Sequence, residues 1–263
     1  MSTLPTQPRS GVPFSRALVR PPTDTLARGI TTSGLGAPDP DLARAQHAAY
    51  CRALEAAGLA VMVLPEAPEH PDACFMEDAA VVLPELAVAA SFGAAPRRAE
   101  AALAARALVP LRPVAALPAG RLEGGDVLMA GRRIFVGLSE RTDPAGAEAL
   151  ARLAGPLGYS VRTVPVPRAP HLKTSVTWLG GDVLVVAPEL AHEPAFQGFE
   201  RIVVPEAERY AACCLWLGDT VLVPAGRPRT AEAVARLGRE VVELDMSEFE
   251  KMDGGLTCLS LRF

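Results

Sequence analysis

The chain has 263 residues, of which 49% are hydrophobic and 21% charged, and this composition is typical of a folded globular protein rather than a disordered one. The formal net charge of −4 at pH 7 gives no electrostatic basis for binding nucleic acid or an anionic membrane surface. The five cysteines are an odd number without a CxxC pair, so they favour neither a disulfide framework nor a structural zinc site.

The N-terminal segment and the hydropathy together predict a soluble, cytoplasmic protein. Residues 1–14 are polar and proline-rich, lack the apolar core of a signal peptide, and are expected to form a flexible tail. No stretch approaches the roughly 20 apolar residues that span a bilayer. Residues 15–263 are therefore expected to form a single domain.

The predicted elements start with a short strand at 16–20, followed by a loop at 23–36 that is rich in Thr, Gly and Ser. Asp39 precedes a helix that ends at Gly58, and its carboxylate can accept hydrogen bonds from the free amide groups of the first turn. A strand at 59–64 follows. Beyond it, hairpins are predicted at 72–91, 122–137, 171–187 and 212–224, helices at 96–108, 144–157 and 230–237, a short segment at 188–196 and a final strand at 256–263.

This alternation is an internal repeat. The equivalent positions Glu77, Glu123, His171, Cys214 and Cys258 follow one another at intervals of 43 to 48 residues. A unit of strand, strand, helix and strand cannot bury its apolar faces alone, so such units pack against each other, and the first and last strands would close the ring. A doubly wound α/β sheet is the competing interpretation, but neither GxGxxG nor GxxxxGK[ST] follows a predicted strand.

The thiol of Cys258 stands just after a turn that contains two glycines, where it could act as a nucleophile. The alternative is a small buried hydrophobic residue, because free cysteines are often buried. In a ring of repeats, His171 would lie near Cys258 and supply the base that a catalytic cysteine needs. Glu123 could orient His171 or merely cap a turn, and both interpretations stay open.

Three carboxylates, those of Asp72, Glu77 and Asp78, cluster within seven residues. They suit an organic cation or a divalent metal, and a solvated acidic loop is the alternative. A guanidinium group fits better than a metal, because its forked donors pair with carboxylates.

Four motifs follow one another along the chain: FMED at 75–78, LEGGDV at 122–127, HLKT at 171–174 and KMDGGLTCLSLRF at 251–263. In this order they resemble the dimethylarginine dimethylaminohydrolases, members of the guanidine-modifying (amidinotransferase and deiminase) superfamily. The resemblance extends from about residue 15 to residue 263. It implies a five-bladed, pseudo-symmetric α/β propeller of ββαβ units around a central active site.

The resemblance also implies a role for each site residue. Cys258 would be the nucleophile, His171 the general acid and base, and Glu123 the group that orients His171. The implied substrate contacts are Glu77 and Asp78 for the guanidinium, directly or through water, Asp72 and the backbone of Ile30 for the amino group, Arg97 and Arg141 for the carboxylate, and Phe75 and Met252 beside them. Arg98 adjoins Arg97, so either arginine could reach the carboxylate.

The implied reaction converts Nω-methylated arginines, asymmetric dimethylarginine and monomethylarginine, to L-citrulline plus dimethylamine or methylamine. It passes through a thiouronium intermediate on Cys258, and it needs no cofactor and no metal, although zinc held by Cys258 and His171 would inhibit. Whether the thiolate is formed before the substrate binds stays open. The chain departs from the family at Ile30, where leucine is frequent, and at Cys213, where asparagine is common.

Two alternative functions remain. An arginine deiminase would use the same groups and release ammonia, but those enzymes are usually longer and carry an extra helical domain. A non-catalytic binder of cationic amino acids would keep the pocket without the reaction. The expected partner is a small-molecule substrate, with no nucleic acid and no membrane, and a homodimer remains open.

Overall fold

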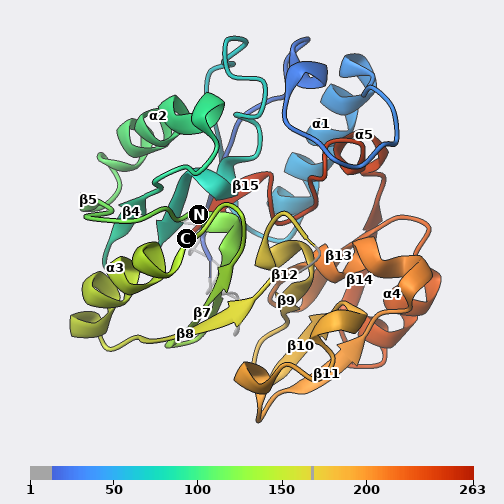
Figure 1. The fold of residues 1–263 in the computed structure, drawn as a ribbon. Helices are drawn as coiled ribbons and strands as arrows, with labels where there is room; N and C mark the ends of the chain where they lie inside the picture. Colours follow the sequence, from blue (N-terminus) through green and yellow to red (C-terminus); the bar gives the residue numbers. More distant parts are fainter. Residues whose placement is uncertain (1–13, 167–168) are drawn as a thin grey trace, which may run out of the picture.

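The computed structural model describes residues 14–166 and 169–263, so all but the last residue of the tail expected at 1–14 lies outside the described residues. Within these residues, fifteen strands form five separate sheets of three strands each. No helix in the described ranges is long and apolar enough to cross a membrane. Figure 1 shows the five units arranged around a common centre, as the ring of repeats predicts.

The five sheets share one topology. The middle strand of each sheet pairs antiparallel with one neighbour and parallel with the other. The strand orders are β15-β1-β2, β3-β4-β5, β6-β7-β8, β9-β10-β11 and β12-β13-β14. The strands are β1 (Arg16–Val19), β2 (Ala60–Val63), β3 (Ala80–Val82), β4 (Ala87–Ala89), β5 (Val114–Ala116), β6 (Val127–Ala130), β7 (Arg133–Leu138), β8 (Ser160–Pro165), β9 (Val176–Trp178), β10 (Val183–Val186), β11 (Glu200–Val203), β12 (Leu215–Leu217), β13 (Thr220–Pro224), β14 (Glu240–Leu244) and β15 (Ser260–Arg262).

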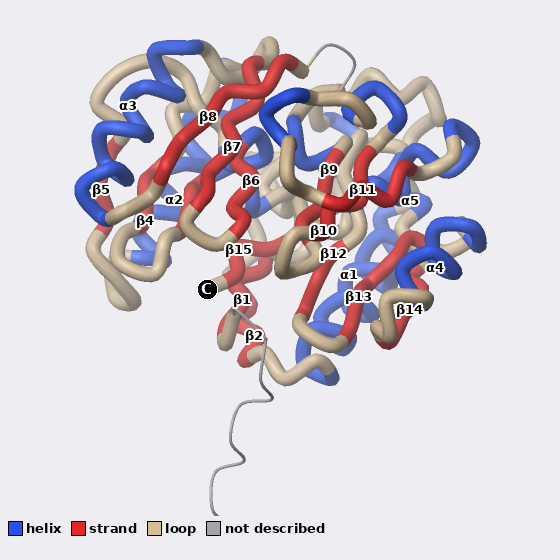
Figure 2. Tube along the Cα trace, turned by 90° about the horizontal axis from the view of Figure 1, so that it is seen from below, coloured by secondary structure: helices blue, strands red, loops and turns tan. Residues whose placement is uncertain are grey.

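A helix links the parallel pair of strands in four of the five units, and Figure 2 shows α2, α3 and α4 at the periphery of the molecule. The α-helices are α1 (Pro40–Ala56), α2 (Arg98–Leu108), α3 (Pro144–Ala154), α4 (Pro228–Ala235) and the short α5 (Ser247–Glu250). Asp39 caps α1 as predicted, because its carboxylate accepts hydrogen bonds from the amides of Asp41 and Leu42. In the fourth unit, the proline-interrupted segment between β10 and β11 forms only two short 3-10 helices, Pro188–Leu190 and Pro194–Phe196.

The two ends of the described chain close the ring. Strand β15 pairs antiparallel with β1, with Leu261 opposite Leu18. This closure confirms the prediction, but the strand is shorter than the expected 256–263. Residues 256–259 form a turn instead, in which the amide of Cys258 donates to the carbonyl of Gly255.

The inner ends of the units are also turns rather than the predicted strand ends. Four 3-10 helices lie there, namely η2 (Met76–Ala79), η4 (Gly124–Asp126), η6 (Leu172–Thr174) and η9 (Glu206–Cys213), and successive ones pack against each other. The amide of Leu172 donates to the Asp126 carboxylate at 2.9 Å. A strand ladder would use such amides, whereas these turns leave them free for buried carboxylates.

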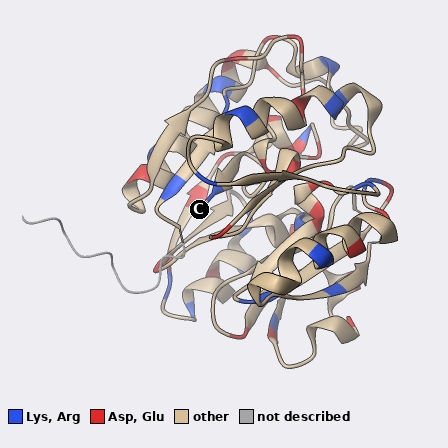
Figure 3. Cartoon of the chain, turned by 90° about the vertical axis from the view of Figure 1, so that its left-hand side faces the viewer, with Lys and Arg blue, Asp and Glu red and all other residues tan. Residues whose placement is uncertain are grey.

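Apolar side chains fill the space between neighbouring units. Phe135 packs edge-on against Phe196 with ring centroids 5.2 Å apart, and Trp178 packs against Trp216 at 4.9 Å. Basic and acidic positions are scattered along the chain in Figure 3, without a large region of one sign. Because the five units pack side by side in a ring, the 3-10 turns at their inner ends meet at the centre of the molecule.

Candidate active site

A cavity of about 340 Å³ opens among the inner turns. Except for Glu77 and Glu123, every site residue predicted from the sequence lines it: Ile30, Asp72, Phe75, Asp78, Arg97, Arg141, His171, Met252 and Cys258. These residues come from four of the five units, one of which is formed by the two ends of the chain. The repeat is what brings them together.

His171 precedes η6 with an extended backbone, and its ring lies between two carboxylates. Nε2 is 2.8 Å from Oε2 of Glu123, which is fully buried, and Nδ1 is 3.5 Å from Oδ1 of Asp78. Glu123 also accepts a hydrogen bond from the amide of Gly93. The ring can approach this closely because Gly125 has no side chain, since a Cβ there would lie 2.8 Å from Nδ1.

The charge state of His171 follows from this environment. Burial lowers the pKa of the imidazole, but Asp78 and the hydrogen bond to Glu123 outweigh it and raise the pKa to about 9. His171 is therefore protonated at neutral pH. It holds a proton that can be given to a leaving group.

Asp78 is held in the cavity by a buried arginine. Nη1 of Arg97 lies 2.7 Å from Oδ2 of Asp78, and the same guanidinium donates to Oε1 of Glu100 at 3.2 Å and to Oε2 at 2.8 Å. Arg98 is exposed, so Arg97 is the arginine that lies in the cavity. The remaining donor of Arg97 reaches the carbonyls of Asp72 and Phe75, so its guanidinium is engaged within the protein.

Glu100 was missed by the sequence analysis. It lies three residues after Arg97, at the spacing that places two side chains on one helix face, and this spacing was the available signal. Burial raises the pKa of its carboxyl to about 7, against the opposing effect of Arg97.

Arg141 is the arginine with free donors. It lines the cavity with a side chain 20% exposed, and Nη1 lies 3.8 Å from Oε2 of Glu123. Within the described residues, this buried Nη1 has no hydrogen-bond partner. The guanidinium is thus available to an anionic group of a ligand.

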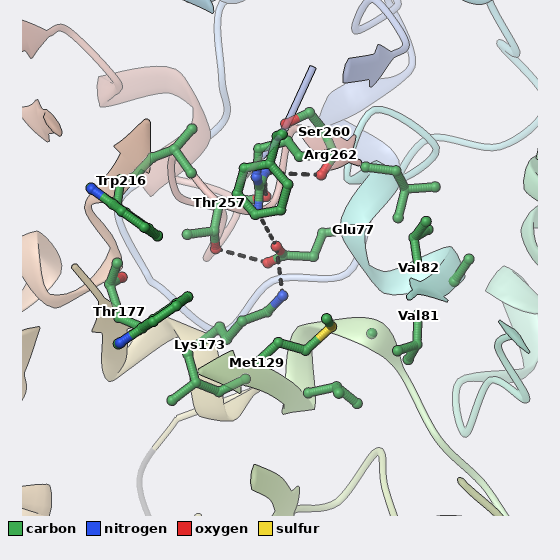
Figure 4. Close-up of a pocket in the computed structure, with 18 of the residues that line it drawn as sticks. Glu77, Val81, Val82, Met129, Lys173, Thr177, Trp216, Thr257, Ser260 and Arg262 are labelled. Carbon is green, nitrogen blue, oxygen red and sulfur yellow. Dashed lines mark hydrogen bonds and ion pairs between the residues drawn. The ribbon is translucent and has the colours of Figure 1, made fainter. Parts of the chain in front are cut away.

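Glu77 does not face this cavity, although the sequence placed it beside Asp78. It lies in a separate pocket of about 110 Å³, where its carboxylate meets Lys173 at 2.7 Å, Arg262 at 2.8 Å and the hydroxyl of Thr257 at 2.8 Å (Figure 4). The difference has a geometric cause. In a 3-10 helix of about three residues per turn, successive side chains point about 120° apart, so Glu77 and Asp78 diverge.

The loop before α1 is tied to the C-terminal motif at the cavity mouth. The amide of Ile30 donates to both oxygens of Asp72 at 3.1 and 3.2 Å, which leaves its carbonyl for a ligand. Asp253 has a left-handed backbone, with φ of 57°, and its carboxylate accepts from the amide of Thr32 at 2.5 Å and the hydroxyl of Thr31 at 3.1 Å. These bonds position the loop against the motif that carries Cys258.

Cys258 is buried and its sulfur accepts a hydrogen bond from the amide of Gly255 at 3.3 Å. Contact with the Cys213 thiol, burial, and the negative charges of Glu77 and Asp78 raise its pKa well above the ordinary value of a thiol. The sulfur is therefore protonated in the free protein. A cation in the cavity would favour its ionisation.

One group of side chains in the described part of the chain could hold a metal ion. It consists of Asp78, Glu123 and His171, whose ligand atoms lie within 4.8 Å of one another. Metal ligands must be deprotonated, and the raised pKa of His171 opposes this at neutral pH. The arrangement suits proton transfer better than metal binding.

Comparison with known proteins agrees with this geometry. Residues 39–204 match the family model for eukaryotic N,N dimethylarginine dimethylhydrolase. The N(G),N(G)-dimethylarginine dimethylaminohydrolase of Pseudomonas aeruginosa is 38% identical over 95% of this chain and 100% of its own length, and that of Streptomyces coelicolor is 39% identical over 95% and 98%. A crystal structure of a variant of the Pseudomonas enzyme with citrulline superposes with a TM-score of 0.93, at 38% identity and coverage of 95% of this chain and 99% of that one. The chain belongs to the dimethylarginine dimethylaminohydrolase family.

Proposed function

We propose that this protein hydrolyses Nω-methylated arginines to L-citrulline and dimethylamine or methylamine. The observation that carries the proposal is the convergence of a thiol, a protonated imidazole and a buried carboxylate on one cavity, at Cys258, His171 and Asp78. This set matches a reaction in which a cationic carbon is attacked and an amine leaves.

The proposed substrate fits the charges around the cavity. The Asp78 carboxylate would accept the forked donors of the guanidinium, and Arg141 would bind the substrate carboxylate. Asp72 and the carbonyl of Ile30 would hold the amino group. Phe75 and Met252 would flank the aliphatic part, with Arg97 fixing the position of Asp78.

The proposed chemistry has two halves. The sulfur of Cys258 attacks the guanidinium carbon, and His171 gives its proton to the amine as the carbon–nitrogen bond breaks, which leaves a thiouronium on Cys258. Neutral His171 then takes a proton from water, whose oxygen attacks the same carbon and displaces the thiolate. General acid and base catalysis of this kind contributes roughly 10²–10⁴-fold to a rate.

The raised pKa of Cys258 favours a thiol that ionises when the substrate arrives. A bound guanidinium adds a positive charge beside a sulfur that is otherwise subject to the negative charges of Glu77 and Asp78. The thiolate would then form next to the carbon that it attacks. In the protein without bound substrate, little of Cys258 would be in the thiolate form.

Amine analysis tests the reaction. We expect dimethylamine and citrulline from asymmetric dimethylarginine, and no turnover by Cys258→Ser, which should still bind the substrate in calorimetry. Cys51→Ser is the matched control, because Cys51 is a partly buried thiol on α1 outside the cavity.

Three results would each overturn part of the proposal. Faster ammonia release from arginine than amine release from methylated arginines would indicate a deiminase. Binding without turnover by the wild type would indicate a non-catalytic binder. Mass spectrometry of protein quenched during turnover should locate a covalent adduct on Cys258, and an adduct on another residue would reject the assigned nucleophile.

A further inference from the structure

Cys213, the last residue of η9, places a second buried thiol beside Cys258. Each thiol shifts the pKa of the other, so the two groups lie close together. Oγ1 of Thr257 lies 3.3 Å from the sulfur of Cys213 and 4.0 Å from that of Cys258. Two sulfur atoms thus share one small space, although they come from different repeat units.

Gly255 makes this approach possible. Its amide donates to the sulfur of Cys258 at 3.3 Å, while a Cβ at this position would lie 2.4 Å from the sulfur of Cys213. Any side chain here would displace the Cys213 thiol. The glycine of the motif therefore admits both sulfurs.

The two thiols border different cavities. Cys258 lines the substrate cavity, whereas Cys213 and Gly255 line a neighbouring cavity of about 370 Å³ together with Tyr210 and Arg209. A small polar molecule can reach Cys213 through this second cavity. It need not pass the substrate.

The ionisation of the pair is divided unequally. Contact with Cys258 lowers the pKa of Cys213 in spite of burial, and the same contact raises the pKa of Cys258. Cys213 is therefore the thiol of the pair that ionises more readily. The thiolate is the form of cysteine that reacts with oxidants.

We propose that Cys213 and Cys258 form a reversible disulfide when the protein meets hydrogen peroxide. The Cys213 thiolate attacks one peroxide oxygen, the oxygen–oxygen bond breaks, and a sulfenic acid forms with release of hydroxide. The sulfur of Cys258 then attacks that of Cys213. Its proton and the sulfenic hydroxyl leave as water, so two thiols and one peroxide give one disulfide and two waters.

The disulfide would silence the site without destroying it. It would remove the sulfur of Cys258 from the substrate cavity, a consequence that rests on the proposed role of Cys258 as nucleophile. A dithiol can restore both thiols by exchange. Without a partner, a sulfenic acid can be oxidised further to states that dithiols do not reverse.

The adjacent Cys214 supplies the matched control. It is as buried as Cys213, but the hydroxyl of Thr177 donates to its backbone carbonyl at 2.9 Å, and burial raises the pKa of its thiol to about 12. Cys214 packs among Leu179 and Ala211, away from the cluster that contains Cys213 and Cys258. Cys214 is thus next to Cys213 in the sequence but belongs to a different hydrophobic cluster from Cys258.

Peptide mapping tests the proposal directly on the wild-type protein, with hydrogen peroxide as the probe. We expect the intact mass to fall by two hydrogen atoms, and digestion without reductant to yield a peptide that joins the Cys213 and Cys258 segments. Dithiothreitol should reverse both changes. These readouts do not depend on the substrate, so they stand even if the proposed reaction fails.

Two variants complete the experiment. For each, the activity after peroxide treatment is compared with the activity of the same variant before treatment, on the substrate that it turns over. Cys213→Ser should lose activity to peroxide roughly tenfold more slowly than wild type, because the more reactive thiolate is gone. Cys214→Ala should behave like wild type and form the same cross-link. The proposal would be overturned if wild-type protein lost thiols without yielding a peptide that joins Cys213 to Cys258. It would also be overturned if peroxide inactivated wild type and Cys213→Ser equally and dithiothreitol rescued them equally.

Discussion

His171 Nε2 lies 2.8 Å from Glu123 Oε2, and this contact leaves Nδ1 as the ring nitrogen that faces Asp78 and the cavity. Glu123 does not line the cavity itself. It therefore acts on the reaction chiefly through His171, by fixing the ring and by supporting its positive charge, since Nη1 of Arg141 lies farther away, at 3.8 Å.

Glu123→Gln should shift the pH dependence of kcat. The pKa of His171 is raised to about 9, so wild-type kcat should stay high at neutral pH and fall only as the pH rises through about 9 and the proton is lost. Removing the Glu123 charge lowers this pKa, so the alkaline limb should move to lower pH. We also expect kcat at pH 7 to fall roughly 10–100-fold, within the range of general acid catalysis.

Stopped assays of citrulline from pH 6 to 10 measure this shift. Glu140→Gln is the control, because Glu140 lines the same cavity and no contact joins it to His171. An alkaline limb that stays in place in Glu123→Gln would mean that another group titrates there.

Asp78 and Glu100 both bind Arg97, but only Asp78 faces the cavity. Asp78→Asn should lower kcat/KM roughly 30-fold or more, because truncating one member of a buried charge pair costs about 2–5 kcal/mol. Glu100→Gln should lower the free energy of unfolding by about 1–3 kcal/mol, with a smaller effect on kcat/KM.

Urea unfolding and steady-state kinetics on both variants separate these two roles. If the two substitutions reduced kcat/KM equally, the effect of Asp78 would be support of Arg97 and not contact with the substrate cation.

Arg141 should recognise the substrate carboxylate, because its donors are free while those of Arg97 are engaged. Arg141→Ala should raise KM for dimethylarginine roughly 10–150-fold, since a hydrogen bond to a charged group is worth about 1.5–3 kcal/mol. An analogue without the α-carboxylate should bind equally to wild type and variant. Arg98→Ala, on the exposed neighbour, should leave both KM values unchanged. Equal losses for both ligands would place Arg141 elsewhere in the mechanism.

The repeat made much of this architecture predictable from sequence. Period and hydrophobicity predicted a ring of repeated units closed by the last strand. The family resemblance carried by the motifs implied that there are five units and that Cys258, His171 and Asp78 meet. The 3-10 turns were not predictable, because their amides donate hydrogen bonds to carboxylates of other units. The amide of Leu172, for example, donates to the carboxylate of Asp126. The direction in which Glu77 faces depends on that same local winding, so it could not be predicted either.

Glu77 makes a separate prediction, because its carboxylate lies between two cations outside the substrate cavity (Figure 4). Glu77→Gln leaves Lys173 and Arg262 without their shared anion, so we expect the free energy of unfolding to fall by about 3–5 kcal/mol. The backbone amide of Glu77 still donates to the carbonyl of Cys258 at 3.0 Å, which keeps the nucleophile in place. The loss of kcat/KM per folded molecule should therefore be smaller than in Asp78→Asn.

A double-mutant cycle with Lys173→Met checks the cause of this loss. Removing the ammonium together with the carboxylate should recover part of the lost stability, because one uncompensated charge is gone. Chemical unfolding of the two single variants and the double variant gives the coupling energy. A full additive loss in the double variant would mean that the ion pair with Lys173 contributes little. A kcat/KM that falls in Glu77→Gln as far as in Asp78→Asn, at unchanged stability, would show instead that Glu77 reaches the substrate cation during the reaction.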